Sequence, residues 1–460
     1  MRQRVVITGL GPVSSVGSGP DEFWRALCAG ETNLGRISSF DPSGYECRLG
    51  GIVEDVPVKK AVPKSYRKAT KVMARDSDLA VVSAQIAAAD AKLKTRGSAE
   101  TEFQPASEDA YEVNLDRLGC SIGAGLLAAE TNELSRALAT AAVEGDHDTF
   151  SYETWGAGEG GGGAMQNLQP LWMLKYLPNM LACHVTIIHG AQGPSNTILC
   201  SESSGLLCLG ESARIIERGD ADACFAGGLE SKLNVISHAR QTAAKRLAST
   251  GDAEDGARVT KPYDPDSPGS IPGEGGALFI TESVEHATSR DAPIYCELTG
   301  FGAGQSGEPL FPSLFDPEHE AGRVDLGLRR AIRAALKDAG IEPGEIDALA
   351  PTALGIPAAD SAEAGALADV FGERLAEIPL IMPTTQAGAS SAGHSALAAA
   401  AAALAIRHQK LPARINAGNP DPRLCAGPAD AQDAALTHVL VCSSGLGGQC
   451  AAAVLKKFDT

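Results

Sequence analysis

The segment from Gly193 to Gly205, with the sequence GPSNTILCSESSG, constrains the fold of this chain more than any other. Its apolar run 197–200 predicts a buried strand, and small residues then lead into a helix-like segment with apolar residues on one face. A strand, a sharp turn and a helix start hold a side chain where backbone N–H groups and the helix dipole favour negative charge. The residue at this turn is Glu202, a poor nucleophile, so a geometry typical of catalysis carries an unusual side chain.

Length and composition favour a large α/β protein. The 460 residues exceed the size at which one core usually stops growing, so two domains or two fused halves are expected. Aromatic residues make up only 5% of the chain, while Ala and Gly are abundant. This balance suits tightly packed α/β layers better than an all-β sandwich.

Charge and cysteine usage exclude several classes of function. The net charge of −18 argues against binding to nucleic acid or to an anionic membrane surface. No apolar run is long enough to span a membrane, and the start of the chain does not resemble a signal peptide. The 11 cysteines are scattered without CxxC pairs, which indicates reduced thiols in the cytoplasm and neither disulfides nor a metal site.

Strand and helix patterns alternate along the chain, which predicts a layered α/β fold. The predicted strands are 5–8, 118–122, 223–226, 276–281, 294–300, 348–350, 438–442 and 451–455. The predicted helices are 20–29, 76–91, 203–218, 326–339, 359–371 and 392–408. Each half repeats a strand, a turn into a helix rich in small residues, and a closing hairpin near a Gly-rich loop, so we expect domains at 1–288 and 289–460.

One segment, 145–169, does not fit this pattern. It is polar and Gly-rich, with GEGGGG at its centre. A phosphate-binding loop would need a preceding strand and a following Lys-Ser/Thr, and neither is evident. A flexible surface insertion is therefore the preferred interpretation.

Many motifs in the correct order resemble the β-ketoacyl-acyl-carrier-protein synthase family, the condensing enzymes of the thiolase fold. They include RVVITGLGPVSSVG, SNTILCSESSGLLCLGESARIIERGDADACFAGGLES, KPYDPDSPGSIPGEGGALFITE and SSGLGGQCAAAVLKK, and they extend over nearly the whole chain. The resemblance implies two related βα halves in a five-layer α-β-α-β-α arrangement. It also implies a dimer and an acyl carrier protein as partner, with no cofactor.

The same resemblance implies that the condensing site is altered. Family members carry the acyl chain on a Cys, use two His for decarboxylation, and support one His with a Lys. The matching positions in this chain are Glu202, Thr352, Thr384 and Ala389. The positions that gate the pocket fall on Ser444, Leu446, Gly447 and Gly448, and two acidic residues of the family are retained as Asp360 and Glu363.

We do not expect other residues to replace the missing nucleophile and His of the condensing site. Cys200 and Cys208 lie near the turn, but neither has an evident His partner, which a thiol needs to ionise near neutrality. His394 follows the position of Ala389 by five residues and is expected off the same helical face, and His184 is expected to be a hydrogen-bonded core residue. For Glu202 we prefer a structural role, satisfied by backbone N–H groups, over acid/base work or mimicry of an acyl or malonyl carboxylate.

A basic segment interrupts this acidic chain between Lys59 and Lys71. A solvated face is one interpretation. The other is a docking surface for the acidic acyl carrier protein, as the resemblance implies, with Lys64, Arg67, Lys68 and Lys71 as candidates and Lys245 and Arg246 as possible additions.

Two function classes remain open. The first is a non-catalytic partner, similar to the chain-length factors of polyketide systems, that forms a heterodimer with an active ketosynthase or a homodimer with itself. The second is an enzyme of altered chemistry, such as a malonyl-carrier decarboxylase or another acyl-carrier-dependent acyltransferase. The chain alone is expected to be inactive in condensation.

Overall fold

Two half-sheets that share one pattern form the centre of the molecule. The computed structural model describes residues 2–98, 101, 112–143, 146–157, 163–307, 324–416, 418–445 and 447–459. The first half-sheet has the order β1 (Val5–Ser14), β10 (Glu274–Ser283), β9 (Ala223–Ser231), β5 (Leu118–Gly123) and β8 (Ser195–Ile198). The second has the order β11 (Cys296–Gln305), β16 (Gln449–Lys456), β15 (His438–Ser444) and β12 (Ala348–Ala350). In both, antiparallel strands lead to parallel ones, so the predicted internal repeat is present.

The half-sheets are joined where β1 pairs with β11 through Val6–Glu297 and Ile7–Cys296. In the second half an isolated parallel bridge between Leu349 and Leu380 takes the place that β8 has in the first. Strand β8 is the last in the path and pairs with β5, so among the described residues one of its backbone edges has no strand partner.

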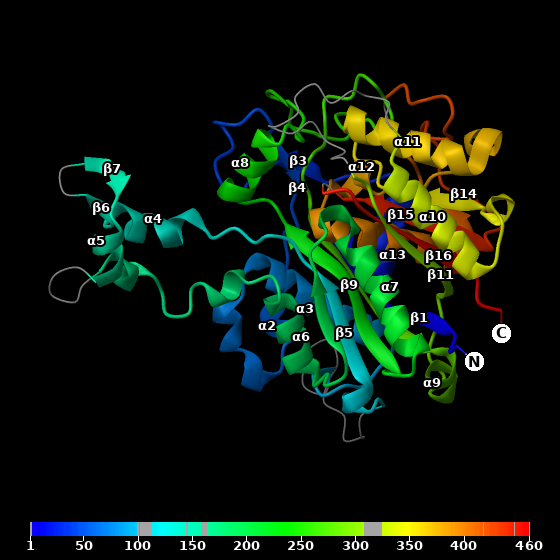
Figure 1. Cartoon of the computed structure of the whole chain (residues 1–460), viewed down its shortest axis with the longest axis horizontal. Helices are drawn as coiled ribbons and strands as arrows, with labels where there is room; N and C mark the ends of the chain where they lie inside the picture. Colours follow the sequence, from blue (N-terminus) through cyan, green and yellow to red (C-terminus); the bar gives the residue numbers. More distant parts are fainter. Residues whose placement is uncertain are drawn as a thin grey trace.

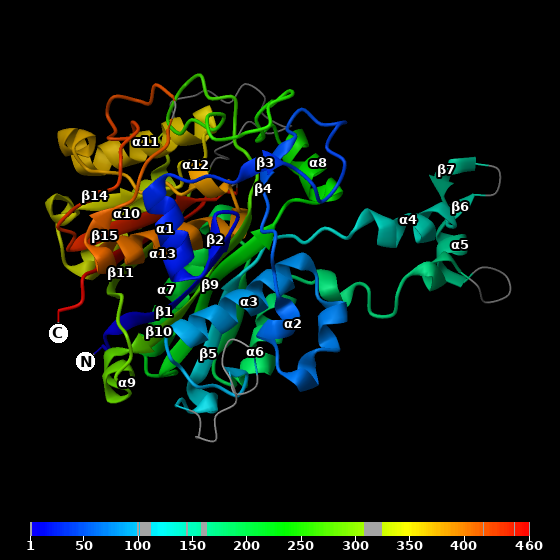
Figure 2. The same cartoon turned by 180° about the vertical axis from the view of Figure 1, so that it is seen from behind.

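Helices form an inner layer and two outer layers around these sheets (Figures 1 and 2). The inner helices are α7 (Ser204–Glu217) and α13 (His394–His408), and they pack in one core with both half-sheets. The outer helices are α3 (Arg75–Asp90) and α6 (Met180–His189) on one side, and α10 (Leu326–Ala339) and α11 (Pro357–Phe371) on the other. The Ala-rich run of α13 is buried because its small side chains let the helix lie between two sheets. The predicted five-layer arrangement is confirmed.

The remaining elements are short. They are β2 (Gly17–Ser18), α1 (Pro20–Ala29), β3 (Leu34–Arg36), β4 (Leu49–Gly51), α2 (Val58–Ala61), α8 (Val235–Ala243), α9 (Val284–Ser289), α12 (Thr384–Ala387), β13 (Lys410–Leu411) and β14 (Gln432–Asp433). The 3₁₀ turns are η1 (Lys64–Tyr66), η2 (Ala69–Val72), η4 (Leu115–Arg117), η5 (Ala164–Asn167), η6 (Leu174–Tyr176), η7 (Ser201–Ser203), η8 (Pro343–Glu345), η9 (Gly372–Ala376) and η10 (Ser391–Gly393).

Most element predictions are confirmed to within a few residues, but the strand at 197–200 is not. Strand β8 ends at Ile198, and its residues are exposed or half-buried. The apolar run suggested burial, whereas the position of β8 at the edge of the sheet leaves it open on one side.

The predicted surface insertion is part of a larger structured lobe, residues 126–178, that projects from the body (Figures 1 and 2). The lobe contains α4 (Thr131–Ala139), a hairpin of β6 (Ala142–Val143) and β7 (Asp146–Phe150), and α5 (Tyr152–Ala157). The segment 145–169 thus contains β7, α5 and η5, and its Gly-rich residues 158–162 lie outside the described part. In the part of the chain that the structure describes, no helix has both the length and the apolar character needed to cross a bilayer.

Candidate functional site

The turn between β8 and α7 places Glu202 at the centre of the molecule. Ser201 adopts a positive φ of 52°, and the backbone then passes through the 3₁₀ turn η7 into the buried start of α7. A matching turn in the second half has Ser391, the first residue of η10, at φ 46° before α13. A positive φ is strained for a non-glycine residue and clusters at functional sites, so both halves carry an elbow of the kind predicted for the first.

Glu202 is fully buried and forms an ion pair with Arg246, which is 4% exposed. Burial by itself would raise the pKa of the Glu202 carboxyl, but the charge and hydrogen bond of Arg246 outweigh it and lower the pKa to about 2. The carboxylate therefore stays ionised at neutral pH and has no proton to donate as a general acid.

This pair corrects two expectations. Glu202 was expected to be satisfied by backbone N–H groups, whereas a guanidinium is its principal partner. Arg246 was a candidate for the carrier-docking surface, but it is buried inside the site. Arg246 lies 44 positions after Glu202 in the sequence, so the two charges come together only in the folded chain.

His394, at the start of α13, lies among the residues predicted for the site. Its Nε2 is 2.7 Å from the carbonyl oxygen of Thr352 and 3.5 Å from Oγ1 of Thr384. Because a carbonyl oxygen only accepts hydrogen bonds, Nε2 carries the proton. Burial lowers the pKa of His394, which keeps the ring neutral. The expectation that His394 lies away from this site is wrong, because the turn η10 directs the first residue of α13 inward.

Two buried carboxylates hold the loop that carries Thr352. Glu363 accepts hydrogen bonds from the backbone N–H groups of Thr352 (2.8 Å) and Ala353 (2.9 Å) and from the hydroxyl of Thr352 (2.7 Å). Asp360 accepts from the N–H groups of Leu354 (3.1 Å) and Gly355 (3.0 Å). Burial raises the pKa of both, that of Asp360 to about 8. Both carboxylates are used structurally, because their oxygens are occupied by the loop.

The positions predicted for the gate are only partly brought together. Ser444 is buried, donates from its backbone N–H to Oγ1 of Thr352 (3.0 Å) and from its hydroxyl to Asp325 (2.6 Å). Gly448 is buried with φ 80°, and Gly447 is exposed. Leu446 lies outside the described residues.

Ala389 packs against the small apolar cluster that contains Leu354 and Ile356. It is half-buried. Of the four positions predicted for the condensing site, Thr352 and Thr384 are thus the two that a single side chain, His394, connects.

The nearby thiols are not activated. Strand β8 ends before Cys200, so Cys200 does not share a strand face with Glu202. Burial raises the pKa of Cys200, and it raises that of Cys208 to about 12. His184 is buried, and its Nδ1 lies 2.9 Å from the hydroxyl of Tyr66, which confirms its role as a hydrogen-bonded core residue.

A cavity of about 330 Å³ opens beside the elbow. Ser201 and Arg246 line it on the elbow side, and Arg240 and Lys232 contribute further positive charge. Lys232 is paired with the buried carboxylate of Glu230. Arg246 therefore borders both the cavity and the buried ion pair at the elbow.

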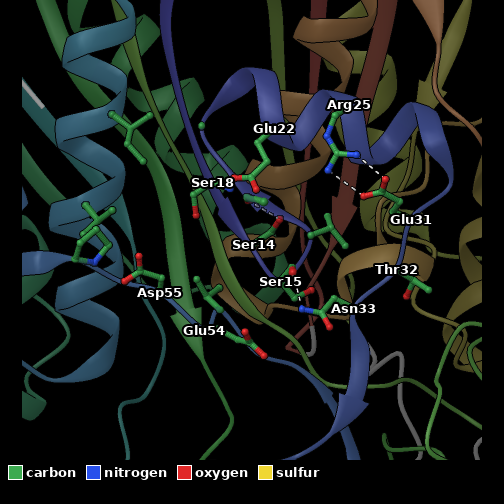
Figure 3. Close-up of a pocket in the computed structure, with 17 residues that line it drawn as sticks. Ser14, Ser15, Ser18, Glu22, Arg25, Glu31, Thr32, Asn33, Glu54 and Asp55 are labelled. Carbon is green, nitrogen blue, oxygen red and sulfur yellow. Dashed lines mark hydrogen bonds and ion pairs between the residues drawn. The ribbon is translucent and has the colours of Figure 1, made fainter.

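A larger groove of about 690 Å³ lies elsewhere, between α1, α3 and the segment 53–57, and shares no lining residue with the cavity at the elbow (Figure 3). Glu22, Glu54 and Asp55 line it, and its guanidinium, Arg25, is paired with Glu31. The charged side chains of its lining are therefore mainly acidic.

Of the predicted docking residues, Lys64 lies in η1 and Lys71 in η2, and Arg67 and Lys68 lie between the two turns. Lys64, Lys68 and Lys71 are exposed, whereas Arg67 is half-buried. The turns form one continuous basic segment, with no acidic residue in either turn.

Comparison with known proteins agrees with this architecture. The profile of the β-ketoacyl synthase N-terminal domain matches residues 2–287, and that of the C-terminal domain matches residues 295–418. The chain therefore belongs to the β-ketoacyl synthase family of fatty acid and polyketide biosynthesis.

Relatives extend over the full length of the chain. The 3-oxoacyl-[acyl-carrier-protein] synthase 2 of Staphylococcus aureus (strain COL) is 29% identical over 459 residues, covering 99% of each chain. That of Synechocystis sp. is 28% identical over 460 residues, covering 100% of this chain and 99% of the relative. Among solved structures, the ishigamide ketosynthase/chain length factor is 26% identical with a TM-score of 0.77 and full coverage of both chains. A type II polyketide ketosynthase in complex with its acyl-carrier protein has a TM-score of 0.80 at 23% identity, again with full coverage, and supports the fold.

Proposed function

We propose that this chain is the non-catalytic partner of an active ketosynthase, in the manner of a chain-length factor. The observation that carries the proposal is the buried Glu202–Arg246 pair at the elbow. A condensing enzyme needs a nucleophile there, whereas this elbow holds two mutually neutralising charges. The similarity to the ishigamide ketosynthase/chain length factor supports the same role.

The open edge of β8 supports pairing with a second subunit. Its residues Ser195 and Asn196 are exposed, and Ile187 and Leu199 nearby are each 49% exposed. An unpaired strand edge flanked by exposed apolar side chains is normally covered. We expect a dimer through this edge, with an interface above the roughly 1,200–2,000 Å² of standard complexes.

The test combines activity and assembly. The purified chain, given malonyl-carrier and acyl-carrier, should release no elongated product, whereas a complex with the ketosynthase of the same host should do so. Analytical ultracentrifugation should show a dimer with that ketosynthase. Elongation by this chain alone, lost in Glu202→Ala, would reject the proposal, as would a strictly monomeric chain in the presence of every such ketosynthase.

The alternative, a malonyl-carrier decarboxylase, is favoured by His394, because a neutral imidazole N–H can stabilise a developing enolate. Its Nε2–H is already donated to the carbonyl of Thr352, so this hydrogen bond must break before it could serve. Carbon dioxide release from malonyl-carrier that is lost in His394→Ala would favour the decarboxylase over the partner subunit.

A further inference from the structure

One face of helix α8 forms a wall of the cavity beside the elbow. The residues of this wall are Ser237, Arg240 and Gln241 of the helix and Ala244 directly after it. Their spacing of i, i+3, i+4 and i+7 places the side chains in one row along a helix. The wall therefore presents a hydroxyl, a guanidinium and an amide to the same space.

The guanidinium of Arg240 is the charge in this cavity that no carboxylate balances. The charged residues of the lining are Glu230, Lys232, Arg240 and Arg246. Lys232 is paired with Glu230, and Arg246 is paired with Glu202. Arg240 forms no ion pair and no side-chain hydrogen bond with the residues that the structure describes. The cavity thus has one positive charge in excess, which favours a ligand with one negative charge.

The hydroxyl of Ser237 is a second group without a partner. Ser237 is 2% exposed, and among the described residues nothing accepts or donates a hydrogen bond at its Oγ. The side chain of Asn234 caps α8 by accepting from the backbone N–H of Ser237 (2.9 Å), so this N–H is already used. A buried hydroxyl that is unpaired costs free energy, which a bound acceptor recovers. A hydroxyl beside a guanidinium is a donor set that suits a carboxylate.

Much of the remaining lining is apolar. Ala124, Leu126 and Leu199 contribute to it, together with Ala244 of the wall. The volume of about 330 Å³ lies at the lower end of the range for sites of small organic ligands. A bare inorganic anion would leave these apolar side chains uncovered, whereas a carboxylate with a hydrocarbon chain would cover them.

We propose that this cavity binds a free medium-chain carboxylate, with Arg240 as its counterion and Ser237 as a hydrogen-bond donor. An acyl chain held as a thioester does not suit the lining, because its far end is an uncharged methyl group and would leave the guanidinium unpaired. The ligand is bound without a covalent step. This inference goes beyond the proposed function and does not depend on it.

The test is titration calorimetry of the full chain with three probes. Octanoate has the charge and the chain, 1-octanol has the chain alone, and inorganic phosphate has negative charge alone. The wild type should bind octanoate about tenfold or more tightly than either of the others, because the charged hydrogen bond needs both partners.

Three variants locate the site. Arg240→Gln should weaken octanoate binding about tenfold and leave octanol binding unchanged, and Ser237→Ala should weaken octanoate binding by a smaller factor. The control is Arg333→Gln, which removes an exposed guanidinium from α10 and should not change the affinity. Arg240→Gln and Arg333→Gln should melt at the wild-type temperature, because both arginines are exposed.

Protection from phenylglyoxal, which modifies arginines, gives an independent measurement. Octanoate should slow the modification of Arg240 and leave that of Arg333 unchanged, as followed by mass spectrometry of peptides. The proposal is overturned if octanoate does not bind, if octanol or phosphate binds equally well, or if Arg240→Gln keeps the wild-type affinity for octanoate. The elongation and assembly assays test the proposed function separately, so either can fail while the other stands.

Discussion

The guanidinium of Arg246 and the carboxylate of Glu202 form an ion pair in which the two side chains are 5% and 0% exposed. Arg246 follows α8, whereas Glu202 lies in the elbow between β8 and α7. The pair therefore joins two separate segments of the first half. Arg246 also lines the cavity beside the elbow, whereas Glu202 does not.

Breaking this pair should destabilise the fold strongly. Glu202→Gln removes the negative charge that Glu202 supplies to the buried guanidinium, so we expect a loss of about 3–5 kcal/mol in the free energy of unfolding. The double variant Glu202→Leu, Arg246→Met should recover most of this loss, because no buried charge remains. Urea denaturation measures all three.

The exposed pair Arg25–Glu31 provides the control, and Glu31→Gln should leave the unfolding midpoint unchanged. A Glu202→Gln variant as stable as the wild type would show that the guanidinium is solvated or paired elsewhere.

The layers of the fold follow from the sequence, because its apolar periods repeat in two halves. The Ala-rich run 394–408 could be predicted as a helix, and its burial between sheets follows from its small side chains. The ion pair at the elbow could be predicted from the sequence only in part. Glu202 could be located from its motif, but Arg246 could not, because nothing local distinguishes it from the exposed Lys245 beside it.

The position of His394 is a second feature that could not be predicted from the sequence. Counting along an ideal helix from Ala389 places it outside the site, but residues 389–393 are not an α-helix. The positive φ of Ser391 turns the chain so that His394 reaches Thr352. Backbone strain of this kind depends on the surrounding packing and has no signature in the residue itself.

A cysteine introduced at position 202 should react with an alkylating reagent, but the variant should not catalyse elongation. In Glu202→Cys the nearby guanidinium would lower the pKa of the new thiol, so iodoacetamide should label it roughly tenfold faster than any wild-type cysteine. Elongation should remain absent, because His394 donates its Nε2 proton to Thr352 and no second imidazole lies at the site among the described residues. Mass spectrometry of labelled peptides and an elongation assay measure the two properties. Elongation by this variant would contradict the proposal that the chain is a non-catalytic subunit.

The pH dependence of stability should report on Asp360. Burial, aided by the charge of Glu363, raises its pKa from 3.8 to about 8 in the folded chain. A raised folded pKa stabilises the fold at low pH, and this contribution is lost as the pH rises from about 4 through about 8. Asp360→Asn should therefore flatten the fall in unfolding free energy over that range, measured by urea denaturation at several pH values.

Asp421→Asn is the matched control, because its partner Arg423 lowers the pKa of Asp421 and its titration lies below this range. An unchanged profile in Asp360→Asn, within the error of the control, would show that Asp360 is ionised throughout in the folded protein.

Charge reversal on the basic segment should weaken carrier binding. Because the chain has a net charge of −18, it repels an acidic carrier at long range, and any docking depends on local charges within about 10 Å. Replacing Arg67 and Lys68 with Glu should therefore raise the Kd for acyl carrier protein and flatten its dependence on salt. The exposed Lys457→Glu reverses one charge away from η1 and η2 and should alter neither. Titration calorimetry of the ketosynthase complex at two salt concentrations measures both effects. Unchanged affinity in an active complex would identify the basic segment as a solvated face.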